Sequence, residues 1–197
     1  MEIRFQIRKK ILQRRDDLSP QQRRVKSEVI FKKLLSFEPL LRSKIVFSYV
    51  HFRSEVETFC LLDTLINQGK ILAVPFTVES EKQLLAVAIT DREKDLEPGF
   101  CSISEPKKEM INQHTIDPGS IDIILLPGAA FDLKCGRMGY GGGYYDRFLA
   151  YQAPNATKIG LGFDLQLVKS LPLEPHDELM DFVVTENQVI KRTERIL

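Results

Sequence analysis

The chain has 197 residues, 43% hydrophobic and 28% charged, which is enough apolar material for a sizeable core and excludes a disordered, collagen-like or disulfide-stapled protein. Its 28 Lys and Arg residues against 27 Asp and Glu leave a net charge of +1, so overall charge gives no reason to expect a nucleic-acid or membrane partner. Three cysteines without a CxxC pair indicate reduced thiols, and the longest apolar run, 123–131, is too short for a bilayer, so we expect a cytoplasmic protein.

A basic helix is predicted at the start of the chain. Ile3, Ile7 and Ile11 recur at helical spacing, and Arg4 and Arg8 form a second stripe beside them. The first 33 residues hold eleven Lys or Arg and only four Asp or Glu, so the positive charge is concentrated here.

A second basic helix follows directly. Ser19, Pro20 and Gln22 are typical of an N-cap, a first helical residue and a capping-box partner, and they predict a helix to about Ser36.

The pattern then changes to strand, helix and strand. A β-branched and aromatic run at 44–50 precedes a helical segment at 57–69, and a strand at 71–75 is expected to end at Pro75. This order predicts a βαβ unit and hence a parallel sheet. Further apolar runs of strand length lie at 84–89, 121–126, 158–163 and 182–185.

These elements predict one domain over residues 1–197, with a three-layer α/β/α, Rossmann-like fold around a mostly parallel central sheet. The segment 91–120 is polar and rich in turn residues. It could close over a ligand or be an inert insertion, and the sequence does not decide between the two.

A glycine-rich loop is the main chemical signal. Five of the eleven glycines fall within eight positions: Gly136, Gly139, Gly141, Gly142 and Gly143. Such a run lets backbone N–H groups approach a ligand, and the helical character of 144–152 would set these groups and Arg137 at a helix N-terminus that favours phosphate. Tyr140, Tyr144 and Tyr145 add flat faces suited to a heterocycle. A flexible turn is the alternative, since neither GxxxxGK[ST] nor GxGxxG is present.

The stretch 125–149, LLPGAAFDLKCGRMGYGGGYYDRFL, resembles the signature of the 5-formyltetrahydrofolate cyclo-ligase family, also called methenyltetrahydrofolate synthetases. Weaker matches occur in the family's order: the basic N-terminal helix, Glu55-Val56-Glu57-Thr58 after the first strand, and Asp181 before an apolar run. Arg4 stands where the family often has Lys, and Met138 where it usually has Leu. The resemblance covers essentially the whole chain.

The resemblance implies a ligase of folate one-carbon metabolism that uses ATP and Mg2+. We expect a monomer, although the sequence does not determine the oligomeric state. Its reaction closes 5-formyltetrahydrofolate, a reduced folate, to 5,10-methenyltetrahydrofolate and releases ADP and phosphate. The formamide oxygen is a poor leaving group, so the family's reaction first phosphorylates it and nitrogen 10 then attacks. Such a site mainly needs positioning and charge neutralisation.

Residue roles carry over from the same resemblance. Catalysis falls to Arg137 and Tyr144, and the Mg2+ carboxylates are Asp146 and Asp181. The ATP site comprises Arg4, Arg8, Arg137, Met138, Gly139, Tyr140, Gly141, Gly142, Gly143, Tyr144 and Tyr145. The folate site comprises Val50, Glu55, Tyr140 and Tyr144.

Each role has a structural alternative. Arg4 and Arg8 could form a solvated helix face, Asp146 and Asp181 could decorate a helix start and a strand entry, and Val50 could be core. Glu57 rivals Glu55 if the motif is shifted by two residues.

Two other functions stay open. A protein of the same scaffold could use ATP to activate another amide or carboxylate. Alternatively, residues 1–33 could bind RNA, with the glycine run as a surface turn.

Overall fold

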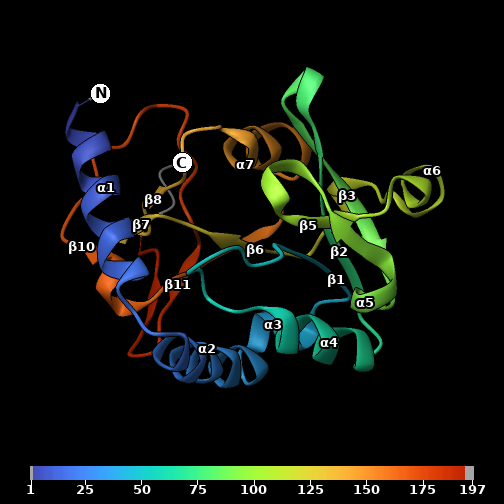
Figure 1. The fold of residues 1–197 in the computed structure, drawn as a ribbon, viewed down its shortest axis with the longest axis horizontal. Coiled ribbons are helices and arrows are strands. Elements are labelled where there is room, and N and C mark those ends of the chain that lie inside the picture. The colour runs from blue at the N-terminus through green and yellow to red at the C-terminus, as the bar shows by residue number, and fades with distance from the viewer. Residues whose placement is uncertain (1, 194–197) are drawn as a thin grey trace.

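The computed structural model describes residues 2–193, and a seven-stranded sheet forms its centre (Figure 1). The strand order is β12-β11-β9-β6-β1-β2-β3. The five inner strands are parallel to one another, and the two edge strands, β12 and β3, each pair antiparallel with the strand beside them. The predicted mostly parallel sheet is therefore confirmed. Its strands are β1 (Ile45–Ser48), β2 (Ile71–Val78), β3 (Gln83–Ile89), β6 (Ile123–Pro127), β9 (Thr157–Leu161), β11 (Phe182–Val184) and β12 (Val189–Lys191).

The predicted βαβ unit is formed by β1, α4 (Phe59–Asn67) and β2, with Ile45 opposite Ile71 in parallel register. The prediction that Pro75 ends the second strand was wrong, because β2 continues to Val78 with Pro75 opposite Ala86 of β3. Pairing of β2 with β1 stops at Ala73, so the missing N–H of Pro75 costs no ladder bond on that side.

Helices cover both faces of the sheet. In Figure 1, α2 (Pro20–Leu35), α3 (Glu38–Arg42) and α4 lie below it, and α7 (Tyr144–Arg147) with the π-helical turn Phe148–Gln152 lies above. Successive residues of β1 supply the two cores: Val46 packs with Leu34 and Leu62, and Phe47 stacks on Phe148 with ring centroids 4.7 Å apart. None of the helices within residues 2–193 is long and apolar enough to cross a membrane.

The predicted capping box of α2 is formed. Gln22 N–H donates to the Ser19 hydroxyl at 3.2 Å, and Ser19 N–H donates to the Gln22 side chain at 2.9 Å. This reciprocal pair fixes where the helix begins.

Helix α1 (Glu2–Asp16) lies against a small sheet in the order β10-β7-β8 (Figure 1). Ile7 and Ile11 pack against Met138 and Leu171, but Ile3 is 68% exposed. The buried apolar stripe therefore begins at Ile7, one turn later than the spacing of the isoleucines predicts. The strands of this sheet are β7 (Ala130–Asp132), β8 (Arg137–Met138) and β10 (Leu167–Val168).

The polar segment 91–120 forms short elements that reach the glycine loop. Glu105 accepts a hydrogen bond from Thr77 of β2, and the Phe100 ring lies 6.1 Å from that of Tyr144. Its elements are α5 (Arg92–Asp95), the antiparallel pair β4 (Leu96–Pro98) and β5 (Ser104–Pro106), and α6 (Ile111–His114). Short 3-10 turns complete the description: Glu79–Glu81, Phe100–Ser102, Lys108–Met110, Pro118–Ser120 and Asp164–Gln166.

Candidate functional site

The glycine loop and α1 meet beside the carboxyl end of β6. Arg8 donates from Nε to the Gly139 carbonyl oxygen at 2.9 Å. Arg4, one turn earlier, donates to the Pro172 carbonyl oxygen at 2.9 Å and to Asp177 Oδ1 at 3.1 Å. The structure thus brings Arg8 to the predicted loop, while Arg4 faces the segment 172–177.

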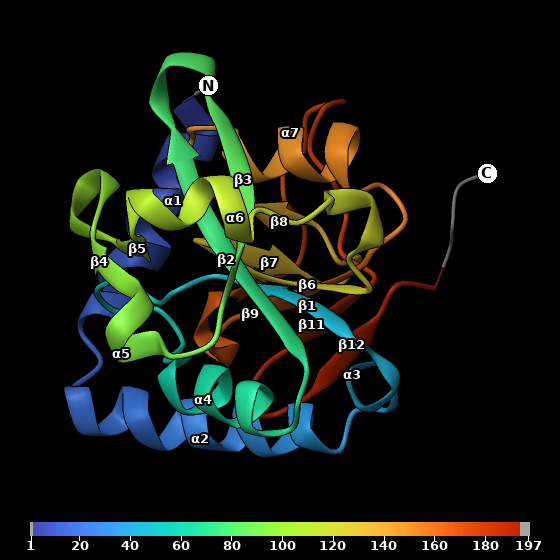
Figure 2. The same ribbon diagram turned by 90° about the vertical axis from the view of Figure 1, so that its right-hand side faces the viewer.

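The loop backbone needs glycine at two positions. Gly141 has φ +102° and Gly143 has φ +67°, a region that side chains disfavour. Arg147 then anchors the loop, because it donates to the Gly142 carbonyl oxygen and to that of Lys82, each at 3.0 Å. Lys82 lies in the turn of the long β2–β3 hairpin (Figure 2), so the loop is fastened to both α1 and this hairpin.

Arg137 lies under the loop and is 3% exposed. It donates to Asp146 Oδ1 at 2.8 Å and to the Pro127 carbonyl oxygen at 3.2 Å. Its Nε is the one buried side-chain N or O atom within residues 2–193 that has no hydrogen-bond partner. Because an unpaired buried donor is costly, this N–H fits a bound oxygen of a ligand.

The two predicted metal carboxylates lie apart. Asp181 precedes β11, and its oxygens accept from Lys158 N–H at 2.9 Å and Arg192 at 3.0 Å. The strand register sets Asp181 level with Ile124, three residues before the end of β6 at Pro127, or about 10 Å along the strand. Among the described residues, no hydrogen-bond partner is shared by Asp146 and Asp181.

Asp177 lies nearer to the glycine loop than Asp181 does. Its neighbour Glu178 donates its N–H to Asp146 at 3.4 Å, and Asp177 itself pairs with Arg4. Burial works against ionisation of Asp177, but the hydrogen bonds from Arg4 and from Glu174 N–H, together with the positive charge of Arg4, outweigh it and lower the pKa of this carboxyl. The sequence reasoning missed Asp177, although it lies only four residues before Asp181.

Glu55 lies in the segment between β1 and α4 and contacts the glycine loop. It is 7% exposed, accepts from the Tyr140 hydroxyl through Oε1, and accepts from Phe52 N–H through Oε2 at 2.9 Å. Burial raises the pKa of Glu55 above its ordinary value, partly offset by the hydrogen bonds from Tyr140 and Phe52 and by the charge of Arg15. Glu57 does not face the loop: its N–H donates to Ser27 of α2.

Arg15 is a second residue that the sequence reasoning missed. It is 3% exposed and donates to the Tyr140 hydroxyl at 2.7 Å, to Ser54 at 3.0 Å and to the Gly128 carbonyl oxygen at 3.3 Å. It follows Arg8 by seven residues, about two helical turns, so helical spacing could have found it.

The remaining predicted residues divide between surface and core. Tyr140 is 47% exposed although its hydroxyl is engaged, and Tyr144 lies half-buried with the Arg147 guanidinium 5.4 Å from its ring centre. Val50, Met138 and Tyr145 pack into the hydrophobic clusters, as the structural alternative for Val50 predicts. Burial raises the pKa of the Tyr145 hydroxyl above its ordinary value.

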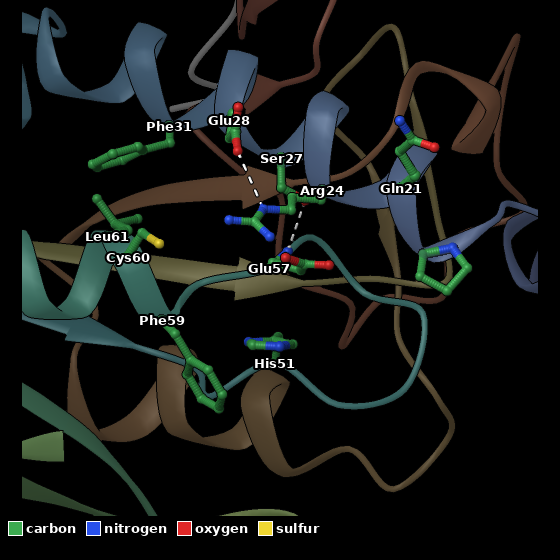
Figure 3. Close-up of a pocket in the computed structure, with 11 residues that line it drawn as sticks. Gln21, Arg24, Ser27, Glu28, Phe31, His51, Glu57, Phe59, Cys60 and Leu61 are labelled. Carbon is green, nitrogen blue, oxygen red and sulfur yellow. Dashed lines mark hydrogen bonds and ion pairs between the residues drawn. The ribbon is translucent and has the colours of Figure 1, made fainter. Parts of the chain in front are cut away.

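A groove between α2 and the start of α4 is separate from this loop (Figure 3). Its volume is about 510 Å³, and none of its lining residues belongs to the glycine loop. Figure 3 shows Arg24 paired with Glu28, and Ser27 bonded to Glu57, so polar groups at the groove are engaged with one another. The full lining is Pro20, Gln21, Arg24, Ser27, Glu28, Phe31, His51, Glu57, Phe59, Cys60 and Leu61.

Comparisons with known proteins agree with the pattern of the loop. Residues 1–186 match the model of the 5-formyltetrahydrofolate cyclo-ligase family. The chain is 30% identical to the 5-formyltetrahydrofolate cyclo-ligase of Haemophilus influenzae, over 92% of this chain and 97% of that one, and 27% identical to the mouse protein of the same name, over 92% of each.

Solved structures give the same match. The 5,10-methenyltetrahydrofolate synthetase of Aquifex aeolicus superposes with a TM-score of 0.85 and 31% identity, covering 99% of this chain and 96% of that one. The synthetase from Mycoplasma pneumoniae, at 22% identity, shares the fold with a TM-score of 0.73 over 93% of this chain and 98% of its own.

Proposed function

The chain belongs to the 5-formyltetrahydrofolate cyclo-ligase family, a family of ligases, and on that premise we propose that it closes 5-formyltetrahydrofolate to 5,10-methenyltetrahydrofolate with ATP and Mg2+. The observation that carries the proposal is the contact between Tyr140 and Glu55. It joins the glycine loop, suited to phosphate, to a carboxylate suited to the donor-rich edge of a reduced pterin.

The chemistry proceeds in two steps. The γ-phosphoryl group of ATP moves to the formyl oxygen, so that oxygen becomes part of a good leaving group. Nitrogen 10 then attacks the formyl carbon and gives up its proton to water, the carbon–oxygen bond breaks, and phosphate leaves as the ring closes. The protein's task is to align the two substrates and to neutralise the charge that moves between them.

Arg8, Arg137 and the loop N–H groups serve the nucleotide half. Arg8 holds the loop through the Gly139 carbonyl oxygen, and its guanidinium is close to Gly141. Arg137 offers the unpaired Nε–H to an oxygen that gains charge during phosphoryl transfer. Helix α7 is only four residues long, so its dipole adds little.

Mg2+ usually binds to one or two carboxylates together with phosphate oxygens, and Asp146 and Asp177 fit this pattern better than Asp181. Asp146 lies beside the loop, and Asp177 lies beside Arg4 on the same side. When bound, the ion would neutralise phosphate charge. Arg137 and Arg4 hold these two carboxylates in position.

Glu55 and Tyr140 serve the folate half. Glu55 accepts from pterin N–H donors, and the exposed ring of Tyr140 supplies a stacking face. The family resemblance also assigns Tyr144, which follows the loop glycines, to both the nucleotide and the folate.

The direct test is a spectrophotometric assay of the purified protein with 5-formyltetrahydrofolate, Mg2+ and ATP, following the methenyl chromophore. We expect a rise that disappears when any one component is omitted. ATP binding without a rise would favour activation of another amide or carboxylate on this scaffold.

We also propose that the enzyme works as a monomer in the cytoplasm without a nucleic-acid partner. Size-exclusion chromatography at several concentrations tests the first point. Salt-sensitive RNA binding by the whole chain would contradict the last.

A further inference from the structure

Arg15 is a charged side chain buried at the folate half of the site. A buried guanidinium is costly unless its N–H groups are paired. Its partners come from three separate segments: Ser54 in the β1–α4 connection, Gly128 just after β6, and Tyr140 in the glycine loop. Ser54 in turn donates to Asp16. Arg15 therefore links α1 to each segment that frames Glu55.

With Glu55 in its carboxylate form, the donor and acceptor roles in this network have only one arrangement. A guanidinium has no acceptor, so the Tyr140 oxygen accepts from Arg15. The single hydroxyl proton of Tyr140 is then left for Glu55 Oε1. The order of donation is Arg15 to Tyr140 to Glu55, and the far end of the chain is the carboxylate proposed to bind the pterin.

Arg15 also supplies positive charge that Glu55 otherwise lacks. The other ionisable groups that face Glu55 are Tyr49, Tyr140 and Tyr145, which are neutral phenols. The neighbouring arginines on α1 point elsewhere, Arg8 to the loop carbonyl and Arg4 to Asp177. Of the four arginines on the helix, one thus lies at the folate half, two lie at the nucleotide half, and Arg14 is exposed.

We propose that Arg15 is a positioning residue for folate binding, acting through the Tyr140 hydroxyl on Glu55, an inference that rests on the proposed function. Removal of Arg15 frees the Tyr140 hydroxyl to rotate away and leaves Glu55 without its nearest cation. The loss therefore falls on the folate and not on ATP.

The test measures KM for both substrates in Arg15→Met, Arg15→Lys and the control Arg14→Met, whose residue is exposed on the same helix. We expect Arg15→Met to raise the folate KM about tenfold or more and the ATP KM less than about twofold. Arg15→Lys, which keeps the charge, should recover part of the loss. Arg14→Met should match the wild type.

A double-mutant cycle with Tyr140→Phe separates positioning from general destabilisation. If Arg15 acts through the hydroxyl, Arg15→Met combined with Tyr140→Phe should raise the folate KM no more than the worse single variant. Independent, multiplying effects would overturn the inference, and so would equal rises in both KM values. Folded Arg15→Lys keeps the test valid if Arg15→Met does not fold. No ring closure by the wild type would instead overturn the proposed function.

Discussion

The glycine-loop region and the groove between α2 and α4 differ in which feature marks them: converging polar side chains at the loop, and a large volume at the groove. At the glycine loop, Arg8, Arg137, Glu55 and Tyr140 converge, and the buried Arg137 Nε has no hydrogen-bond partner among the described residues. The groove is a cavity of about 510 Å³ whose polar residues include the ion pair of Arg24 with Glu28. We therefore place the proposed site where polar groups converge and are incompletely satisfied, and not where the cavity volume is large.

The largest expected effect is the loss of Arg137 at the loop, compared with the loss of Arg24 at the groove. Arg137→Met should lower kcat by about 100-fold or more, because it removes the charge beside the moving phosphoryl group. Arg24→Met in the exposed groove should leave kcat within about twofold. Both are measured in the methenyl assay, with circular dichroism to verify folding. A comparable loss in Arg24→Met would break the comparison.

The carboxylates proposed to bind Mg2+ provide the next largest effect. Asp177→Asn should raise the Mg2+ concentration needed for half-maximal rate by about tenfold, whereas Asp181→Asn should leave it unchanged. Titration of the rate with Mg2+ checks both. A larger increase in the Mg2+ requirement for Asp181→Asn than for Asp177→Asn would show that Asp181, and not Asp177, binds the ion.

Asp146→Asn should weaken Mg2+ use and also folding. It leaves the buried Arg137 guanidinium without its ion-pair partner, a loss of about 3–5 kcal/mol in the free energy of unfolding. Urea unfolding alongside the Mg2+ titration measures the two effects. Full stability in this variant would show that the Arg137 pair is not formed in solution.

The pH dependence of folate binding sharpens the comparison further. Glu55 has a raised pKa, so the carboxylate form, and with it folate affinity, should be lost as pH falls at a higher pH than for an ordinary glutamate. Tyr140→Phe removes a hydrogen bond that lowers this pKa and should move the loss to still higher pH. Folate titrations at several pH values measure it. A folate affinity that does not change with pH in the acid range would show that Glu55 does not bind the pterin.

The groove makes a prediction about stability. Burial, with the charge of Arg92, lowers the pKa of His51 from 6.5 to about 4. The unfolded chain therefore takes up this proton first, and the free energy of unfolding should fall by about 1 kcal/mol between pH 6.5 and 4, allowing for solvent screening. His51→Asn should flatten this slope, while His114→Asn, an exposed control, should not. Equal slopes would contradict it.

The sequence predicted six of the seven strands of the central sheet, all but β12, and also the two basic helices and the glycine loop, because each depends on local periodicity, capping or glycine spacing. The family resemblance is confirmed by the match over residues 1–186. Local patterns could not show that β2 continues through Pro75, since that depends on where β1 stops pairing. They also could not show that Asp177 pairs with Arg4, or that Arg15 contacts Tyr140, because these are long-range contacts.

The most direct test of two substrate halves meeting at one loop is a pair of KM measurements on Arg8→Ala and Glu55→Gln. We expect Arg8→Ala to raise the KM for ATP more than that for 5-formyltetrahydrofolate, and Glu55→Gln to show the reverse bias. Equal losses for both substrates in both variants would contradict this division of the site.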